Sequence, residues 1–87
     1  MHCWDDAKNE ANRAKHGIDF AAAVLVFEAL TVEFEVADSL ARYGEVRLNA
    51  FGTIADRLFL CVYTPRCGWR HIISLRRASK KEVQLYG

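Results

Sequence analysis

Four segments of this chain carry a strand-like pattern at short intervals, namely residues 31–36, 45–51, 57–63 and 70–77. In the first two segments apolar side chains alternate with polar ones, which is typical of half-buried strands. The third segment is apolar enough to lie in the middle of a sheet. Because consecutive strands with short links favour antiparallel neighbours, the sequence predicts an antiparallel meander.

The links between these strands contain residues that favour turns. Residues 64–69 include Pro65 and Gly68 and are predicted to form a loop, whereas residues 52–56 are predicted to form a turn. Residues 37–44 are predicted to be a polar connection between the first two strands.

Two helices are predicted before the strands. Asp5 or Asp6 can cap a first helix with an inner face of alanines, and Gly17 can end it. Asp19 can cap a second helix. The apolar stripe of this second helix consists of Phe20, Ala23, Val24 and Phe27.

A third helix is predicted at the end of the chain, where Ser79 and Glu82 have the spacing of a capping box. Helices outside a run of consecutive strands place the chain in the α+β class. We expect two N-terminal helices packed on an antiparallel sheet, with a short C-terminal helix, in a single domain spanning residues 1–87.

The composition favours a compact domain. The chain has 87 residues, 52% of them hydrophobic, and a single proline. No stretch without a charged residue exceeds eight residues, whereas about 20 are needed to cross a bilayer. No signal-peptide pattern is visible. Three cysteines without CxxC spacing argue against a disulfide framework and fit a reducing compartment, so we expect a cytoplasmic protein.

The charges are distributed unevenly along the chain. Residues 1–56 hold five Lys/Arg and ten Asp/Glu, a net charge of −5, whereas residues 57–87 hold seven Lys/Arg and one Asp/Glu, a net charge of +6. A basic C-terminal part suits binding to nucleic acid or to an acidic partner. Cys67 and His71 are four residues apart but lack a further set of ligands, so neither a metal nor another cofactor is expected.

The last predicted strand carries several arginines. Strict alternation would place Arg70, Ser74 and Arg76 on one face, with His71 and Arg77 on the other. The first set can meet phosphate groups. Alternatively, these arginines are the solvated ends of an ordinary amphipathic strand.

A set of short motifs resembles the BrnT family of toxins from bacterial type II toxin–antitoxin pairs, over residues 4–86. The motifs are Trp4-Asp5, Lys8, Asn12, Lys15-His16-Gly17-Ile18, Phe20, Val26-Phe27, Gly44-Glu45, Arg47, Tyr63-Thr64, Arg66, Arg70-His71-Ile72-Ile73-Ser74 and Arg76. The resemblance implies a RelE-like ribonuclease fold and inhibition of translation by RNA cleavage. It also implies a BrnA-like antitoxin that forms a hetero-oligomer with the toxin and supplies the DNA-binding part.

A ribonuclease of this kind can work without a metal, because the 2′-hydroxyl of the RNA attacks the adjacent phosphorus. The protein then supplies a base, an acid and cations. The predicted catalytic residues are Glu45, Arg66, Arg70, Arg76, His16 and Tyr63. The arginines match family positions and would hold phosphate, Glu45 is the first candidate base, and His16 and Tyr63 are alternative proton carriers.

Four further residues are predicted to contact RNA, namely Lys15, Arg47, Trp69 and Arg77. Several candidates of both groups have structural alternatives: Lys15 and His16 can stabilise the carbonyl end of the first helix, Trp69 can anchor a core, and Glu45 can form a surface ion pair. His71 is the weakest proton carrier, because alternation turns it away from Arg70 and Arg76. A non-catalytic basic module that binds RNA or a protein is the competing hypothesis.

Overall fold

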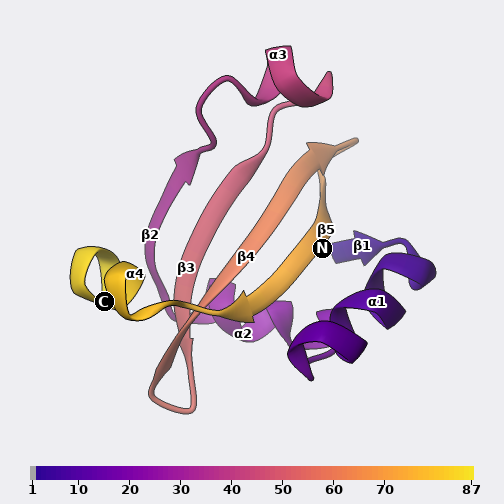
Figure 1. Cartoon of the computed structure of the whole chain (residues 1–87). Helices are drawn as coiled ribbons and strands as arrows, with labels where there is room; N and C mark the ends of the chain where they lie inside the picture. The colour runs from indigo at the N-terminus through magenta and orange to yellow at the C-terminus, as the bar shows by residue number, and fades with distance from the viewer. Residues whose placement is uncertain (1) are drawn as a thin grey trace.

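Five strands form one mixed sheet in the computed structural model, which describes residues 2–87 (Figure 1). The strands lie in the order β1-β5-β4-β3-β2. Their bounds are β1 (His2–Trp4), β2 (Leu30–Glu35), β3 (Leu48–Ile54), β4 (Arg57–Arg66) and β5 (Trp69–Arg77). The meander from β2 to β5 is antiparallel, as predicted. The sheet is mixed because β1, which the sequence did not reveal, pairs parallel with β5.

The helices are α1 (Asp6–His16), the 3-10 helix η1 (Phe20–Ala22), α2 (Ala23–Glu28), α3 (Ser39–Tyr43) and α4 (Lys80–Tyr86). The predicted ends of α1 are confirmed, since Asp5 caps its start and Gly17 ends it with φ of 72°. The capping box of α4 is also confirmed. The α+β class follows from these elements.

The second predicted helix begins with a 3-10 turn. Asp19 caps η1, and the α-helix begins only at Ala23. Its buried side uses Val26, whereas Val24 is 43% exposed. The predicted stripe was therefore wrong at Val24, because the 3-10 turn changes the angular position of the residues that follow it.

The turns between strands are tighter than predicted. Only Ala55 and Asp56 link β3 to β4, and only Cys67 and Gly68 link β4 to β5, all four with positive φ. Two-residue turns with positive φ match the twist of paired strands. The hydrogen-bond ladder therefore extends to Arg66 in β4, and the predicted loop at 64–69 is mostly strand.

Two more boundaries differ from the sequence prediction. The strand expected at 45–51 begins at Leu48, and the polar connection at 37–44 contains α3. A helix of five residues is too short to reveal itself by periodicity. It anchors the entry to β3, because the buried Ser39 hydroxyl accepts a hydrogen bond from the Arg47 amide at 3.0 Å.

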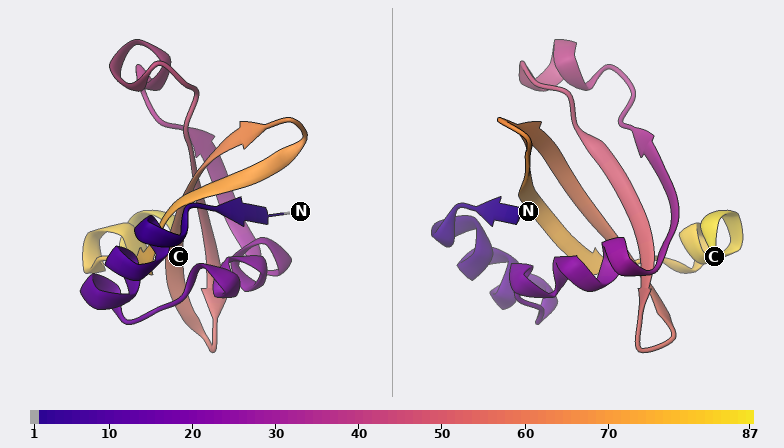
Figure 2. Two further views of the ribbon diagram at one scale, coloured as in Figure 1. Left: turned by 90° about the vertical axis from the view of Figure 1, so that its right-hand side faces the viewer. Right: turned by 180° about the vertical axis from the view of Figure 1, so that it is seen from behind.

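Helix α2 lies against one face of the sheet, which we call the helix face (Figure 2). The main core lies between this helix and that face. It is built from Phe20, Ala23, Val26, Ala50, Cys61, Tyr63, Ile72 and Leu75. The opposite face, called here the open face, carries a smaller core of Phe51, Leu58 and Leu60. Tyr86 of α4 covers that smaller core and stacks on Phe51 at 4.6 Å between ring centroids.

A β-bulge in β5 changes which side chains share a face. Val62 of β4 pairs with Ser74, but the next residue, Tyr63, pairs with Ile72, so Ile73 is an extra residue. On the C-terminal side of the bulge, Arg76 lies on the open face. On its N-terminal side, Arg70 lies on the helix face, where its guanidinium is 4.0 Å from the Phe27 ring centroid.

The strict alternation predicted for β5 is therefore wrong. Arg70 and Arg76 lie on opposite faces, whereas His71 and Arg76 lie on the same face. An extra residue shifts the alternation by one position, because side chains repeat every two residues along a strand.

At the edge of β5, beyond the part that pairs with β1, the Asn12 side chain of α1 makes the hydrogen bonds that a neighbouring strand would make. Its Nδ2 donates to the Leu75 carbonyl at 2.8 Å, and its Oδ1 accepts from the Leu75 amide at 3.2 Å. The same Nδ2 also donates to the Ile18 carbonyl at 3.2 Å. Buried backbone groups that would otherwise lack partners are thereby satisfied, and α1 is held along β5.

Replacing Asn12 with alanine should lower the free energy of unfolding by about 2–4 kcal/mol, because two buried backbone groups of Leu75 lose their partners. The matched control is Glu10→Ala, which removes a surface ion pair with Arg13 on the same helix and should cost less than about 1 kcal/mol. Urea unfolding of both variants checks this. Equal losses would show that the Asn12 bonds do not hold α1 in place.

Candidate functional site

Two pockets on the open face meet at Ile73 and Ser74 of β5. One is about 300 Å³ and lies between β5 and α1, and the other is about 310 Å³ and lies over β3, β4 and β5. The bulge places both Ile73 and Ser74 at the floor of the pockets. The site is therefore built around the irregular point of the sheet.

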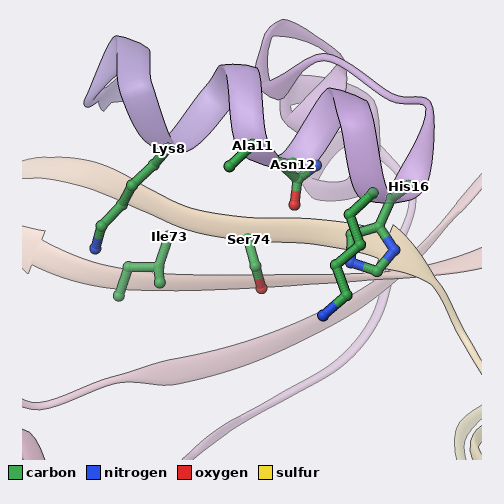
Figure 3. A pocket seen from close by; sticks show the side chains of 7 residues that line it. Lys8, Ala11, Asn12, His16, Ile73 and Ser74 are labelled. Atoms are coloured by element: carbon green, nitrogen blue, oxygen red, sulfur yellow. The ribbon is translucent and has the colours of Figure 1, made fainter.

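The first pocket is lined by cationic residues of α1. Lys8 and His16 extend from the helix on either side of the Ser74 hydroxyl (Figure 3). Lys15 also lines this pocket. Helical spacing brings Lys8 and Lys15 to the same side as Asn12. The bonds from Asn12 to Leu75 therefore also fix where these cations lie.

The second pocket has an apolar floor and a polar rim. Its lining residues are Val36, Tyr43, Arg47, Asn49, Leu60, Val62, Ile73, Ser74 and Arg76. The Arg47 guanidinium stacks on the Tyr43 ring at 3.8 Å from the ring centroid. The lining residues include no carboxylate, and the rim presents the guanidinium groups of Arg47 and Arg76.

Glu45 lies at the end of the open face between two arginines. Its Oε1 accepts from Arg66 Nη2 at 3.1 Å, and its Oε2 accepts from Arg47 Nε at 3.4 Å. The hydrogen bond from Arg66 is the main reason that the pKa of Glu45 is below its ordinary value. Glu45 is therefore an ionised partner that orients both arginines and has little tendency to take up a proton.

Arg76 is oriented by Glu82 of α4. Arg76 Nη1 and Nη2 donate to the two carboxylate oxygens of Glu82 at 2.8 and 2.9 Å. Arg76 Nη1 also donates to the Arg77 carbonyl at 3.1 Å. Since a guanidinium has five donors, Nε and one Nη2 hydrogen have no acceptor within residues 2–87 and remain for a ligand.

Both histidines of the open face have a pKa below the ordinary value, which favours the neutral imidazole at pH 7. Desolvation lowers the pKa of His16 most, and the charges of Lys15 and Arg76 lower it further. Desolvation is also the main reason that the pKa of His71 is lowered, followed by the charges of Arg66 and Lys8. A neutral imidazole can accept a proton, so both are available as bases.

His71 also contacts a cysteine. Its Nδ1 lies 3.4 Å from the Sγ atom of Cys3, which belongs to the neighbouring strand β1. This contact orients the imidazole at the edge of the open face.

The structure separates Tyr63 and Arg70 from the rest of the predicted catalytic set. Both lie on the helix face, where the Tyr63 hydroxyl donates to Glu33 at 2.6 Å. Burial and this bond raise the pKa of Tyr63, which opposes loss of its proton. The Arg70 guanidinium lies 4.0 Å from the Phe27 ring centroid and 5.7 Å from that of Tyr63, and its Nη1 is 3.4 Å from His2 Nε2.

The remaining predicted residues divide in the same way. Six of them belong to the open face or its rim, namely Glu45, Arg66, Arg76, His16, Lys15 and Arg47. Trp69 is 41% exposed beside Arg66 at the hairpin end, so it is not a core anchor. Arg77 is exposed and follows Arg76 on the opposite face of the strand.

Sequence reasoning did not assign site roles to several lining residues. The spacing of Lys8, Asn12 and Lys15 at i, i+4 and i+7 was a signal that could have grouped them. The alternation predicted for residues 45–51 puts Asn49 on the same side as Arg47. Glu82 gave no signal as a partner of Arg76, because that contact depends on how α4 turns back onto the sheet.

Within residues 2–87 no group of three or more His, Cys, Asp or Glu is arranged to hold a metal ion. No helix among these residues is both long and apolar enough to cross a membrane.

Comparison with known proteins gives one family. The family model for the ribonuclease toxin BrnT of type II toxin–antitoxin systems matches residues 4–82 of the chain. No curated protein matches the chain significantly. The matched range includes both pockets and Glu82.

Replacing Glu82 with glutamine should lower the free energy of unfolding at pH 7 by about 1.5–3 kcal/mol, because Arg76 loses its charged partner. The pKa of Glu82 is lowered to about 2, mainly by the hydrogen bonds from Arg76. A lowered pKa stabilises the fold above the ordinary carboxyl pKa, and this contribution is lost as pH falls toward 2. Urea unfolding should therefore show the two proteins converging as pH falls from 5 to 3.

The control for this variant is Glu10→Gln, whose carboxylate pairs with Arg13 on the exposed side of α1. It should change stability little at either pH. A difference between wild type and Glu82→Gln that stays constant with pH would contradict the ionic account.

Proposed function

Because the chain belongs to the BrnT family of ribonuclease toxins of type II toxin–antitoxin systems, we propose that it cleaves RNA on its open face, without a metal, by attack of the 2′-hydroxyl. The supporting observation is the junction at Ser74, where cations from α1 and β5 meet a neutral imidazole. Such an arrangement suits a phosphate that gains negative charge during the reaction.

The scissile phosphate lies over Ser74 in this proposal. The free Nε of Arg76 and the ammonium of Lys15 hold its oxygens, and the Ser74 hydroxyl donates to one of them. His16, neutral at pH 7, takes the proton from the 2′-hydroxyl as that oxygen attacks phosphorus. The bond to the 5′ oxygen breaks, and a lysine ammonium of α1 supplies the proton to it.

In this proposal Glu45 does not act as the base. With Arg66 and Arg47 on its two oxygens, it positions these arginines for the neighbouring phosphates. Arg70 and Tyr63 act structurally, because the bulge and their mutual contact keep them on the helix face.

The type II family implies a protein antitoxin as partner. We infer that this partner is BrnA-like, forms a hetero-oligomer with the chain and carries the contacts to DNA. We also infer that the helices pack against the sheet as in the RelE-like fold. Inhibition of translation would then result from RNA cleavage. These finer assignments rest on the family motifs of the sequence.

The test uses purified chain without antitoxin, single-stranded RNA and excess chelator. Cleavage that leaves 2′,3′-cyclic phosphate ends is expected, and His16→Ala or Arg76→Gln should slow it by about 10²-fold or more. The control is Arg57→Gln, which alters an exposed arginine at the far end of β4 and should leave the rate unchanged.

Two results would contradict the proposal. Strict dependence of cleavage on an added metal ion would exclude the 2′-hydroxyl mechanism without metal. Binding of RNA with no new termini would favour the non-catalytic module. Unfolding curves of each variant separate loss of activity from loss of fold.

A further inference from the structure

The Asn49 side chain is an unused hydrogen-bonding group in the second pocket. It projects from β3 onto the open face, opposite Val62 of β4. Its amide makes no hydrogen bond within residues 2–87, whereas Asn9 and Asn12 are both engaged. A side-chain amide carries two donor hydrogens and one acceptor oxygen, so it can pair with a ligand edge that presents both kinds of group.

Arg47, which lines the pocket beside Asn49, is held by several contacts. Arg47 stacks on the Tyr43 ring, and its Nε donates to Glu45. Its backbone is fixed as well, because its amide donates to Ser39 and its carbonyl accepts from the Val36 amide at 2.8 Å. A guanidinium plane held in this way is a surface on which an unpaired base can stack.

The other walls match the remaining parts of a nucleotide. Val36, Leu60 and Val62 give an apolar floor for a ring, and Arg76 lies at the rim where the pocket meets the Ser74 junction. A nucleotide bound with its base over this floor would have its phosphate next to Arg76. The volume of about 310 Å³ falls in the range of small-molecule sites.

We propose that this pocket is a base-specific subsite, in which Asn49 reads an unpaired adenine next to the scissile phosphate and the Arg47–Tyr43 stack holds the base. Adenine presents an acceptor at N7 beside a donor at N6, which is the pattern that an asparagine amide matches with two hydrogen bonds. In single-stranded RNA these edges are free to be read. The inference rests on the proposed function for its substrate, but its binding test does not require cleavage.

The binding test uses single-stranded 2′-O-methyl RNA, which lacks the attacking hydroxyl and stays intact. Both oligonucleotides are otherwise all uridine; one carries a single central adenine, and the other carries 7-deazaadenine at that position, which lacks the N7 acceptor. Fluorescence anisotropy should show wild type preferring the adenine oligonucleotide by about 5-fold to 150-fold, the discrimination expected when one side of a bidentate contact is removed. Asn49→Ala should reduce this preference to less than about 2-fold while binding the 7-deazaadenine oligonucleotide as before.

Two further variants sharpen the test. Asn49→Asp keeps the shape of the side chain but replaces the donor that N7 needs, so it should also lose the preference. Thr53→Ala, on the same strand outside the pocket, should keep it. Equal binding of both oligonucleotides by wild type would overturn the inference, as would a preference retained by folded Asn49→Ala and Asn49→Asp.

Failure of this inference can be told apart from failure of the proposed function. RNA that is cut by wild type and by Asn49→Ala with the same preference for positions next to adenine would leave the ribonuclease standing and remove the subsite. An adenine preference in binding that disappears in both Asn49 variants, without cleavage of ordinary RNA, would keep the subsite and remove the ribonuclease.

Discussion

The pairing of the Asn12 amide with the backbone of Leu75 determines how the rest of the structure is assembled. Strand β1 covers only part of the β5 edge, and the Asn12 side chain supplies hydrogen bonds beyond it. Because the bonds hold α1 against β5, they also bring Lys8, Lys15 and His16 to the first pocket. A structural contact and the position of the candidate site therefore depend on the same side chain.

The bulge at Ile73 is the second constraint, because it decides which arginines act together. It turns Arg70 toward Phe27 and leaves Arg76 on the open face with Ser74. On that face three arginines have a carboxylate partner, Arg76 in Glu82 and both Arg66 and Arg47 in Glu45. Such pairing reduces the freedom that a flexible side chain would lose on binding phosphate.

Local chemistry in the sequence predicted much of the fold. Asp5, Gly17 and the Ser79–Glu82 capping box define helix ends through nearby contacts, and alternation defined the antiparallel strands. The bulge was not predictable, since no glycine or proline marks Ile73 and only the pairing with β4 reveals the extra residue. For the same reason the sequence grouped Arg70 with Arg66 and Arg76, whereas the structure places Arg66 and Arg76 on the open face and Arg70 on the helix face.

The central claim is that RNA lies over the open face at Ser74, and mapping of amide chemical shifts by NMR tests it most directly. Titration with an uncleavable 2′-O-methyl RNA should shift the amide signals of His16, Ser74 and Arg76, with little change at Tyr63 and Arg70. Shifts concentrated at Tyr63 and Arg70, with the Ser74 region unchanged, would contradict the account.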